Sequence, residues 1–250
     1  MRKEKKFIVI TGPDGCGKKI QTGLLTEKFI KNGDCVETID FPRYKDNFFG
    51  EMVGRYLSGE FGKATEVSPY LASILYAGDR WESMRQINQW LENGKIVICD
   101  RYVGDNFLHQ GSKIVNFLDR KRFFEWLEVL EFCVFNARRA DVTFYLNVPL
   151  EISLELLEKK DAKERRDYTG GKKDGHENRD HLSKVRKIAD ELTQRFGWTK
   201  IDCMKNGKLM PQEEISIILW KILKEQRVLP RVDPVIAPRA DDVANDGDPY

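Results

Sequence analysis

The sequence has few cysteines, almost no net charge and no long hydrophobic run, and each shortage excludes a class of protein. Its five cysteines are scattered, odd in number and without a CxxC pair. That excludes a disulfide framework and a cysteine-based zinc site, and it is typical of reduced cytosolic thiols. The 42 Lys and Arg residues nearly balance the 40 Asp and Glu residues, so no nucleic-acid partner is expected. No stretch approaches the roughly 18–20 apolar residues of a membrane helix.

The N-terminal residues are basic, as in a signal peptide, but the apolar run 7–10 is too short for the core of such a peptide. We therefore expect a cytoplasmic protein with no membrane partner. A chain of 250 residues that is 41% hydrophobic is long enough to bury a large core. No internal repeat is visible.

Five short apolar runs are nearly continuous, which is typical of strands buried on both faces of a parallel sheet. They span residues 7–11, 35–41, 96–99, 142–148 and 200–203. Helical patterns lie between and after them, at residues 18–31, 70–93, 117–135, 150–160, 181–196 and 211–226. Strands that alternate with helices predict one α/β domain over residues 1–226, a three-layer fold with a five-stranded parallel sheet and helices on both faces.

Two segments interrupt this pattern. Residues 159–173 hold seven Lys or Arg, three Asp or Glu and a Gly-Gly pair. This composition predicts a mobile cationic loop. Residues 227–250 contain four of the nine prolines and five aspartates, and no aromatic residue before Tyr250. Such a stretch buries too little apolar surface to order itself, so we expect a disordered tail.

The strongest functional motif follows the first predicted strand and opens the first predicted helix. It consists of Gly12, Pro13, Asp14, Gly15, Cys16, Gly17, Lys18 and Lys19. Glycines let backbone N–H groups face a phosphate, the helix N-terminus adds positive potential, and Lys18 reaches the outer phosphates. The motif predicts an ATP site with Mg²⁺. The alternative is a glycine-rich turn with a solvated lysine. Lys19 departs from the usual Ser or Thr, whose hydroxyl helps to hold magnesium.

Four further segments, taken with this loop, resemble the thymidylate kinase family of P-loop nucleoside monophosphate kinases. They are Asp40-Phe-Pro-Arg43, Tyr76-Ala-Gly-Asp-Arg80-Trp-Glu82, Asp100-Arg-Tyr-Val103 and His109-Gln-Gly111. The resemblance spans about residues 7–225. It implies a P-loop NTPase fold with a basic lid at about 159–177, transfer of the ATP γ-phosphoryl to dTMP, and a homodimer. Gly104-Asp105-Asn106 departs from the family pattern, so no role is carried over to it.

The resemblance also implies roles for single residues at the acceptor. Asp14 would face the acceptor nucleotide, Tyr76 would stack on the thymine, and Gln110 would lie beside the base. Further acceptor contacts would come from Phe41, Arg43, Arg80, Arg101 and Tyr102, with Lys45 as the alternative to Arg43. Arg80 and Arg101 would grip the acceptor phosphate, because the planar guanidinium fork suits phosphate oxygens.

Magnesium and the lid complete the expected site. Asp100, at the end of a predicted strand, would hold magnesium through its waters. Glu177, at a glutamate position of the family, would be the last residue of the lid segment and a substrate contact. Since Gly15 leaves the phosphate loop without an arginine, the cation for the transition state would be Arg165 or Arg166. The alternative for this basic run is a solvated helix end. For Tyr76 the alternative is a core aromatic. For Arg101 it is a surface ion-pair partner, and for Tyr102 it is a packing ring.

Two other functions stay open at this level. A deoxynucleoside kinase would not need two arginines for an acceptor phosphate, so Arg80 and Arg101 argue against it. A catalytically silent nucleotide-binding module is supported by Lys19 alone, whereas the set Asp14, Lys18, Asp100 and Arg101 argues for catalysis.

The lid generates a first prediction. Arg165→Ala or Arg166→Ala is expected to lower turnover by about 10³-fold or more, the effect of removing an arginine finger elsewhere. Equilibrium binding of either nucleotide alone should change far less. Normal turnover in the double variant would place the transition-state cation elsewhere in the chain.

Overall fold

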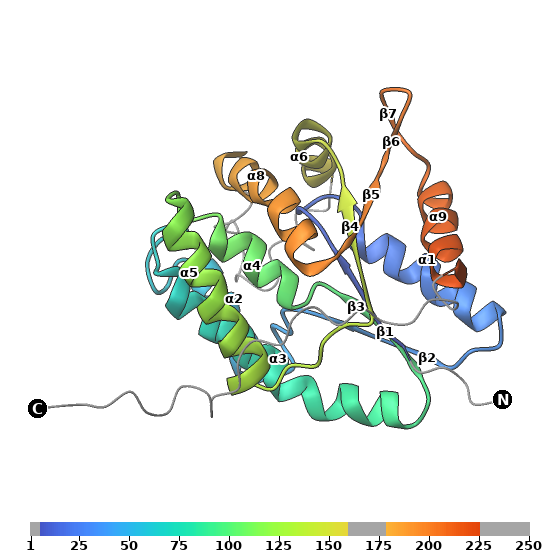
Figure 1. Ribbon diagram of the computed structural model, residues 1–250, viewed down its shortest axis with the longest axis horizontal. Helices are drawn as coiled ribbons and strands as arrows, with labels where there is room; N and C mark the ends of the chain where they lie inside the picture. The colour runs from blue at the N-terminus through green and yellow to red at the C-terminus, as the bar shows by residue number, and fades with distance from the viewer. Residues whose placement is uncertain (1–5, 160–178, 226–250) are drawn as a thin grey trace, which may run out of the picture.

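The protein is described by a computed structural model over residues 6–159 and 179–225. Five parallel strands form one sheet, as predicted, and the structure gives their order as β2-β3-β1-β4-β5 (Figure 1). They are β1 (Lys6–Thr11), β2 (Val36–Asp40), β3 (Ile96–Asp100), β4 (Val142–Asn147) and β5 (Thr199–Asp202). Most of the predicted lid, with Arg165, Arg166 and Glu177, and the predicted tail lie outside the described residues.

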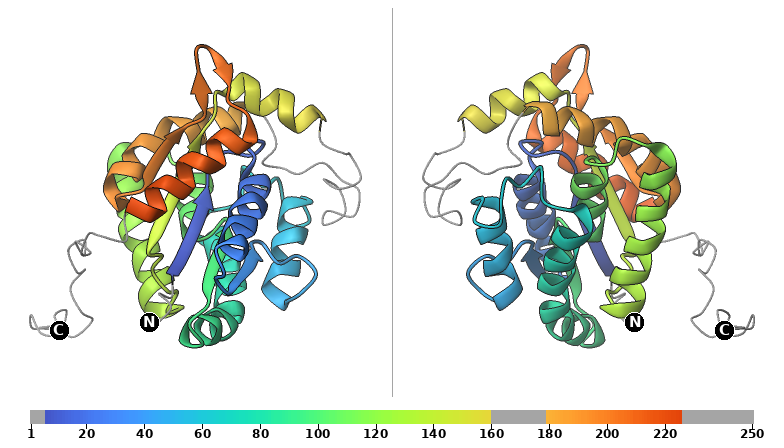
Figure 2. Two further views of the ribbon diagram at one scale, coloured as in Figure 1. Left: turned by 90° about the vertical axis from the view of Figure 1, so that its right-hand side faces the viewer. Right: turned by 90° about the vertical axis from the view of Figure 1, so that its left-hand side faces the viewer.

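Helices cover both faces of the sheet, which makes the three predicted layers (Figure 2). One face packs against α3 (Pro69–Glu92), α4 (Val103–Gly111), α5 (Phe117–Glu128) and α8 (Arg179–Phe196). The other packs against α1 (Lys18–Lys31) and α9 (Gln212–Glu225). In β1, Phe7 and Val9 enter the first core and Ile8 and Ile10 the second, because successive side chains of a strand point to opposite faces.

The remaining elements are short. They are α2 (Phe48–Leu57), the π-helix η1 (Val129–Val134), α6 (Leu150–Lys159) and a hairpin of β6 (Met204–Lys205) and β7 (Lys208–Leu209). In the part of the chain described here, no helix is long and apolar enough to cross a membrane.

Three helical elements differ from the sequence prediction, and the β6–β7 hairpin was not predicted either. Helix α2 was not predicted, because its glycines weaken the helical pattern. The glycines allow close packing, since a Cβ at Gly50 would lie 2.1 Å from the Arg43 carbonyl oxygen. Helix α4 was also not predicted, because its polar residues hide its periodicity, although nearly all of them are buried. The predicted helix 117–135 divides into α5 and η1.

Strand register decides where chemistry can occur. Ile10 of β1 pairs with Asp100 of β3, and the Arg101 N–H donates to the Ile10 carbonyl at 3.0 Å. The Phe41 N–H donates to the Asp100 carbonyl at 3.1 Å. The carboxyl ends of β1, β2 and β3 therefore meet at one edge of the sheet, where ligands bind in open α/β folds.

Candidate active site

The glycine-rich loop wraps tightly between β1 and α1 because two of its glycines have no substitute. Gly12 has φ 147°, and an added Cβ would lie 2.9 Å from the Leu146 carbonyl oxygen. A Cβ at Gly15 would lie 2.4 Å from the Ser153 carbonyl oxygen. Gly17 caps α1 without any side-chain hydrogen bond to its first N–H groups, and no acidic residue lies in the first turn. Free N–H groups at a helix N-terminus attract phosphate.

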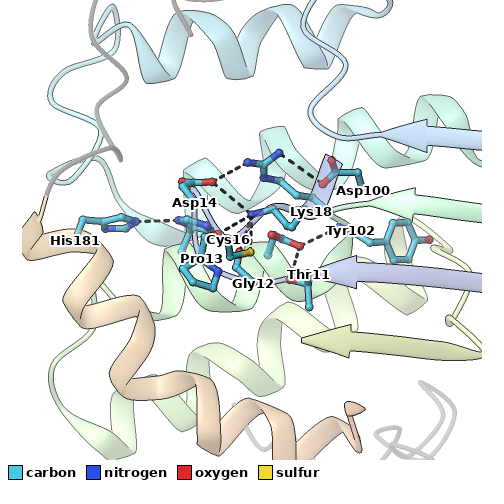
Figure 3. A network of polar contacts seen from close by, with 12 residues as sticks. Thr11, Gly12, Pro13, Asp14, Cys16, Lys18, Asp100, Tyr102 and His181 are labelled. Carbon is cyan, nitrogen blue, oxygen red and sulfur yellow. Dashed lines mark hydrogen bonds and ion pairs between the residues drawn. The ribbon is translucent and has the colours of Figure 1, made fainter. Parts of the chain in front are cut away.

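Lys18 lies inside this loop. Its ammonium donates to the carbonyl oxygens of Gly12 at 2.8 Å and Pro13 at 3.0 Å, and its side chain is 3% exposed (Figure 3). The charge is thereby held at the centre of the loop rather than in solvent, which argues against the solvated-lysine alternative. Burial raises the pKa of the adjacent Cys16 thiol to about 11, so the thiol stays protonated.

Asp14 links the loop to β3. Its Oδ1 accepts a hydrogen bond from Arg101 Nη2 at 2.7 Å and lies 3.7 Å from Lys18 Nζ (Figure 3). Burial by itself would raise the pKa of Asp14, but the charges of Arg101 and Lys18 outweigh it and hold the pKa well below its usual range. The carboxylate is ionised at neutral pH, between two cations that can also face phosphate.

Arg101 has a strained backbone, with φ 64° in the left-handed region. Strain of this kind costs of order 1–3 kcal/mol and is concentrated at functional sites. It turns the side chain from the end of β3 toward the loop, where it stays 33% exposed. The neighbouring Asp100 is buried, which raises its pKa, and its Oδ1 accepts no hydrogen bond from the described residues.

Asp105 ties α4 to the loop. Its Oδ2 accepts hydrogen bonds from Thr11 Oγ1 at 2.8 Å and from the Tyr102 N–H at 3.1 Å (Figure 3). The residue lies in the segment that departs from the family pattern, and the sequence assigned it no role. An acidic residue three positions after a strand–helix turn was the available signal, since it caps the helix.

On the other side of the site, Arg43 and Asp79 fix the segment after β2. The Arg43 N–H donates to Asp79 Oδ2 at 3.1 Å, and Asn47 Nδ2 donates to Asp79 Oδ1 at 2.8 Å. The guanidinium of Arg43 reaches Asp46, Ser83 and Gln86 and stays partly exposed. The contact of Arg43 with the acceptor stays a prediction.

Arg80 lies deeper than the sequence predicts. It is 2% exposed, and its Nε donates to Glu131 Oε2 at 3.1 Å while its Nη2 donates to Glu131 Oε1. The sequence assigned Arg80 to the acceptor phosphate and gave no sign of Glu131 as its partner. Because Nε and Nη2 of the guanidinium contact Glu131, this edge is not free to bind a phosphate.

Two predicted acceptor contacts have side chains in the core. Phe41 is 2% exposed, and Tyr102 is 3% exposed with its ring edge-on to Phe7 at 4.9 Å. The Tyr102 hydroxyl donates to Met84 Sδ at 3.5 Å. We therefore correct both side chains to packing rings, which for Tyr102 was the alternative. Tyr102 follows β3, which is buried along its whole length, and Phe41 follows the edge strand β2, yet both rings pack into the same core.

The remaining acceptor-side residues lie on helices α3, α4 and α8. Tyr76 is half-buried and edge-on to Tyr56. Gln110 is 0% exposed, and neither atom of its side-chain amide has a partner among the described residues. His109 Nδ1 lies 3.0 Å from His181 Nε2, and burial together with His109 lowers the pKa of His181 to about 3. Base stacking by Tyr76 and base contact by Gln110 stay predictions.

Comparison with known proteins decides the family. The thymidylate kinase family model matches residues 10–214. The chain belongs to the thymidylate kinase family. It is 32% identical over 225 residues to a probable thymidylate kinase of Thermococcus onnurineus, which covers 87% of this chain and 99% of that protein. It is 26% identical to the thymidylate kinase of Plasmodium falciparum over 80% and 94% of the two chains.

Comparison with solved structures finds the same fold. A solved thymidylate kinase of Candida albicans superposes with a TM-score of 0.66 at 20% identity, over 90% of this chain and 93% of that one. The predicted P-loop fold is therefore confirmed. Membership of this kinase family makes the chain a nucleotide-binding phosphotransferase.

The sequence analysis missed Asp79, Asn106 and Glu131. Each is buried and hydrogen-bonded at the acceptor side. Glu131 carried a readable signal, because it follows Leu127 by four residues on the apolar face of its helix. A carboxylate at a core position requires a cationic partner.

Asp79 generates a prediction about stability and pH. Burial outweighs its hydrogen bonds and raises its pKa to about 6. Between about pH 4 and pH 6 the native state holds a proton that the unfolded chain has lost, so stability falls as pH rises. The unfolding free energy of the parent relative to Asp79→Asn should fall by about 2–3 kcal/mol from pH 4 to pH 7.

Urea unfolding at the two pH values measures this difference. Asp46→Asn is the matched control, because Asp46 is an exposed aspartate in the segment after β2 that Asp79 holds. A parent-minus-variant difference for Asp79→Asn that does not change with pH would contradict the assignment.

Proposed function

We propose that the loop 12–19, the end of β3 and the helices α3 and α4 form one site that binds ATP and dTMP side by side. Family membership supplies the reaction, in which the γ-phosphoryl of ATP passes to dTMP to give dTDP. Phosphoryl transfer needs little covalent chemistry and much positioning and positive charge. The observation that carries the proposal is the ion-paired set of Lys18, Asp14 and Arg101.

On the donor side, the N–H groups of the loop and of the first turn of α1 would hold the ATP phosphates. Lys18 would turn from the Gly12 and Pro13 carbonyls toward the phosphate that is transferred. That exchange is favourable because a phosphate oxygen is a better partner for ammonium than a neutral carbonyl.

The residues at the end of β3 fit a magnesium ion. Asp100 offers a buried carboxylate oxygen that accepts no hydrogen bond within the described ranges, and oxygen ligands are those that Mg²⁺ prefers. Among the described residues there is no group of three or more His, Cys, Asp and Glu that would enclose a metal. This suits an ion that keeps most of its waters and takes one or two protein groups. When bound, magnesium would neutralise charge on the transferring phosphoryl group.

On the acceptor side, Arg101 would hold the dTMP phosphate, with Arg43 beside it. Arg101 is the more exposed of the two and is already fixed by Asp14. Asp14 would keep this guanidinium oriented and face the sugar side of the acceptor. We move Arg80 from the phosphate to the base side, because its guanidinium lies against Glu131. Arg165 or Arg166 of the lid segment would supply the transition-state cation.

A coupled assay of ADP formation tests the reaction. We expect turnover with dTMP and little with thymidine, because the nucleoside lacks the phosphate that Arg101 would hold. Arg101→Ala should lower dTMP turnover or affinity by roughly 10–100-fold, the range for losing a hydrogen bond to a charged group. Thymidine as the better acceptor would establish the deoxynucleoside kinase instead.

Lys19 decides between the enzyme and the silent module. It is exposed at the second position of α1, and an ammonium group has no lone pair for a metal. We expect parent activity that rises with magnesium, since Asp100 and waters suffice. Activity absent at every magnesium concentration in the parent and restored by Lys19→Ser would establish the silent module.

We further propose a homodimer in the cytoplasm. Large apolar side chains are exposed along α3, α5 and η1, at Tyr70, Leu71, Trp81, Phe117, Leu118, Val129 and Val134. A concentration of this kind on one side of a protein marks an association surface. A second copy fits it because the family resemblance implies a symmetric pair.

Sedimentation velocity tests the dimer. Trp81→Glu should shift the protein toward monomer, since a buried charge at the interface has no partner. The matched control is Ile217→Glu on α9, which is exposed to 57% against 54% for Trp81 and lies on the opposite face of the sheet. A monomeric parent would refute the dimer.

A further inference from the structure

Asp79 of α3 is a fully buried carboxylate whose hydrogen-bond partners are uncharged groups. Its Oδ2 accepts a hydrogen bond from the Arg43 N–H at 3.1 Å, and its Oδ1 accepts one from Asn47 Nδ2 at 2.8 Å. The residue is 0% exposed, and its burial outweighs these hydrogen bonds and the nearby arginine charges, so that its pKa is raised to about 6. At neutral pH the ionised form is therefore a cost to the fold, and stability gives no reason to prefer this carboxylate over an amide.

The carboxylate holds Arg43 by its backbone and leaves the guanidinium to other groups. Arg43 Nε donates to Asp46 Oδ2 at 3.1 Å, and the Asp46 side chain is 57% exposed. Arg43 Nη1 donates to Ser83 Oγ at 3.2 Å and to Gln86 Oε1 at 3.3 Å. An ion pair at the surface contributes little to stability, so it is easily exchanged. The main chain of this arginine is thus fixed in the interior, while its guanidinium can exchange its partners for an anionic ligand.

Helix α3 fixes the rest of the segment after β2 as well, through contacts nearer to solvent. The Phe49 N–H donates to Oε2 of Glu82, an exposed residue, at 2.9 Å. The Phe49 ring covers Gly78, where a Cβ would lie 2.5 Å from Cγ of the ring. Asn47, the second partner of Asp79, caps helix α2 through its side-chain oxygen. One buried carboxylate therefore joins both the start of α2 and the segment before it to α3.

We propose that Asp79 is a positioning residue that fixes the backbone of Arg43 and thereby aims its guanidinium at the acceptor phosphate. The inference rests on the proposed function, in which Arg43 lies beside Arg101 at the dTMP phosphate. It also selects Arg43 over Lys45, the alternative contact, because the buried carboxylate is bonded to the backbone of Arg43. A guanidinium whose main chain is fixed in advance loses less entropy when it binds phosphate.

The variant Asp79→Asn tests the proposal. A carboxylate accepts with both oxygens, whereas an amide has one oxygen and an NH₂ group that would face one of the two donors. The backbone of Arg43 is then held less firmly. We expect KM for dTMP to rise about 10-fold or more, the effect of losing a buried hydrogen bond to a charged group, while kcat and KM for ATP stay near the parent values.

A double-variant cycle shows whether Asp79 acts through Arg43. Arg43→Ala removes the guanidinium and should itself raise KM for dTMP. In that background Asp79→Asn should add little, because two changes to one interaction are not additive. In a Lys45→Ala background the full rise should remain. Full additivity with Arg43→Ala would overturn the proposal, and a rise that disappears in the Lys45→Ala background would assign the contact to Lys45.

Exchanging the two polar side chains should restore the contact. In Asn47→Asp/Asp79→Asn the amide on α3 donates to the carboxylate on the loop, and the amide oxygen accepts the Arg43 N–H. Aspartate is a favoured N-cap, so α2 keeps its first turn. We expect KM for dTMP to return toward the parent value, whereas Asn47→Asp alone sets two carboxylates together and should raise it. Should Asp79→Asn fail to fold, this pair of variants supplies the same test.

The matched control is Asp141→Asn. Asp141 Oδ2 also accepts a backbone N–H, that of Phe7 at 2.7 Å, but it does so at the amino end of β1. The proposed site lies at the carboxyl ends of the strands, so this variant should leave KM for dTMP unchanged.

Three further results would overturn the proposal. One is an unchanged KM for dTMP in a folded Asp79→Asn variant. Another is an equal rise in KM for dTMP and for ATP, which is what simple loosening of the fold would produce. The third is an exchange variant that folds and shows no recovery. A parent that does not phosphorylate dTMP at all would overturn the proposed function, which separates that failure from the other three.

Discussion

The pairing of β1 with β3 is the constraint on which the site depends. It sets Ile10 opposite Asp100 and anchors the Arg101 N–H on the Ile10 carbonyl. Only in this register does Arg101 come within 2.7 Å of Asp14, although the two residues are 87 positions apart. A shift by one residue would turn every side chain of the strand to the other face of the sheet. The charges of Asp14 and Arg101 would then be separated.

In the proposed site, the two substrates would be bound by different kinds of group. The donor side would consist of backbone N–H groups and one lysine, in a loop of eight residues. The acceptor side would include charges and amides buried between helices, such as Asp79, Asn106 and Glu131. Buried polar groups of this kind are rigid when satisfied, and each unsatisfied atom favours a ligand that satisfies it. Under the proposal, recognition of the acceptor therefore depends on the core.

Prediction from the sequence succeeded where the decisive interactions are local. Apolar runs located all five strands, and the glycine spacing located the loop around Lys18. It failed where a side chain lies on an apolar helix face or directly after a strand. Periodicity identifies the face on which Arg80 lies but not the carboxylate that meets it, because Glu131 is 51 residues away. For the same reason Tyr102 was expected to face the substrate and instead packs on Phe7.

The sequence by itself determined the α/β class, the phosphate loop and the family resemblance, because each is carried by residues that are neighbours in the chain. The tertiary structure alone decided which charged groups meet. It brought Asp14 to Arg101, Arg80 to Glu131 and Thr11 to Asp105. Ion pairs and hydrogen bonds act over a few ångströms in space, and the spacing of residues along the chain does not predict those distances.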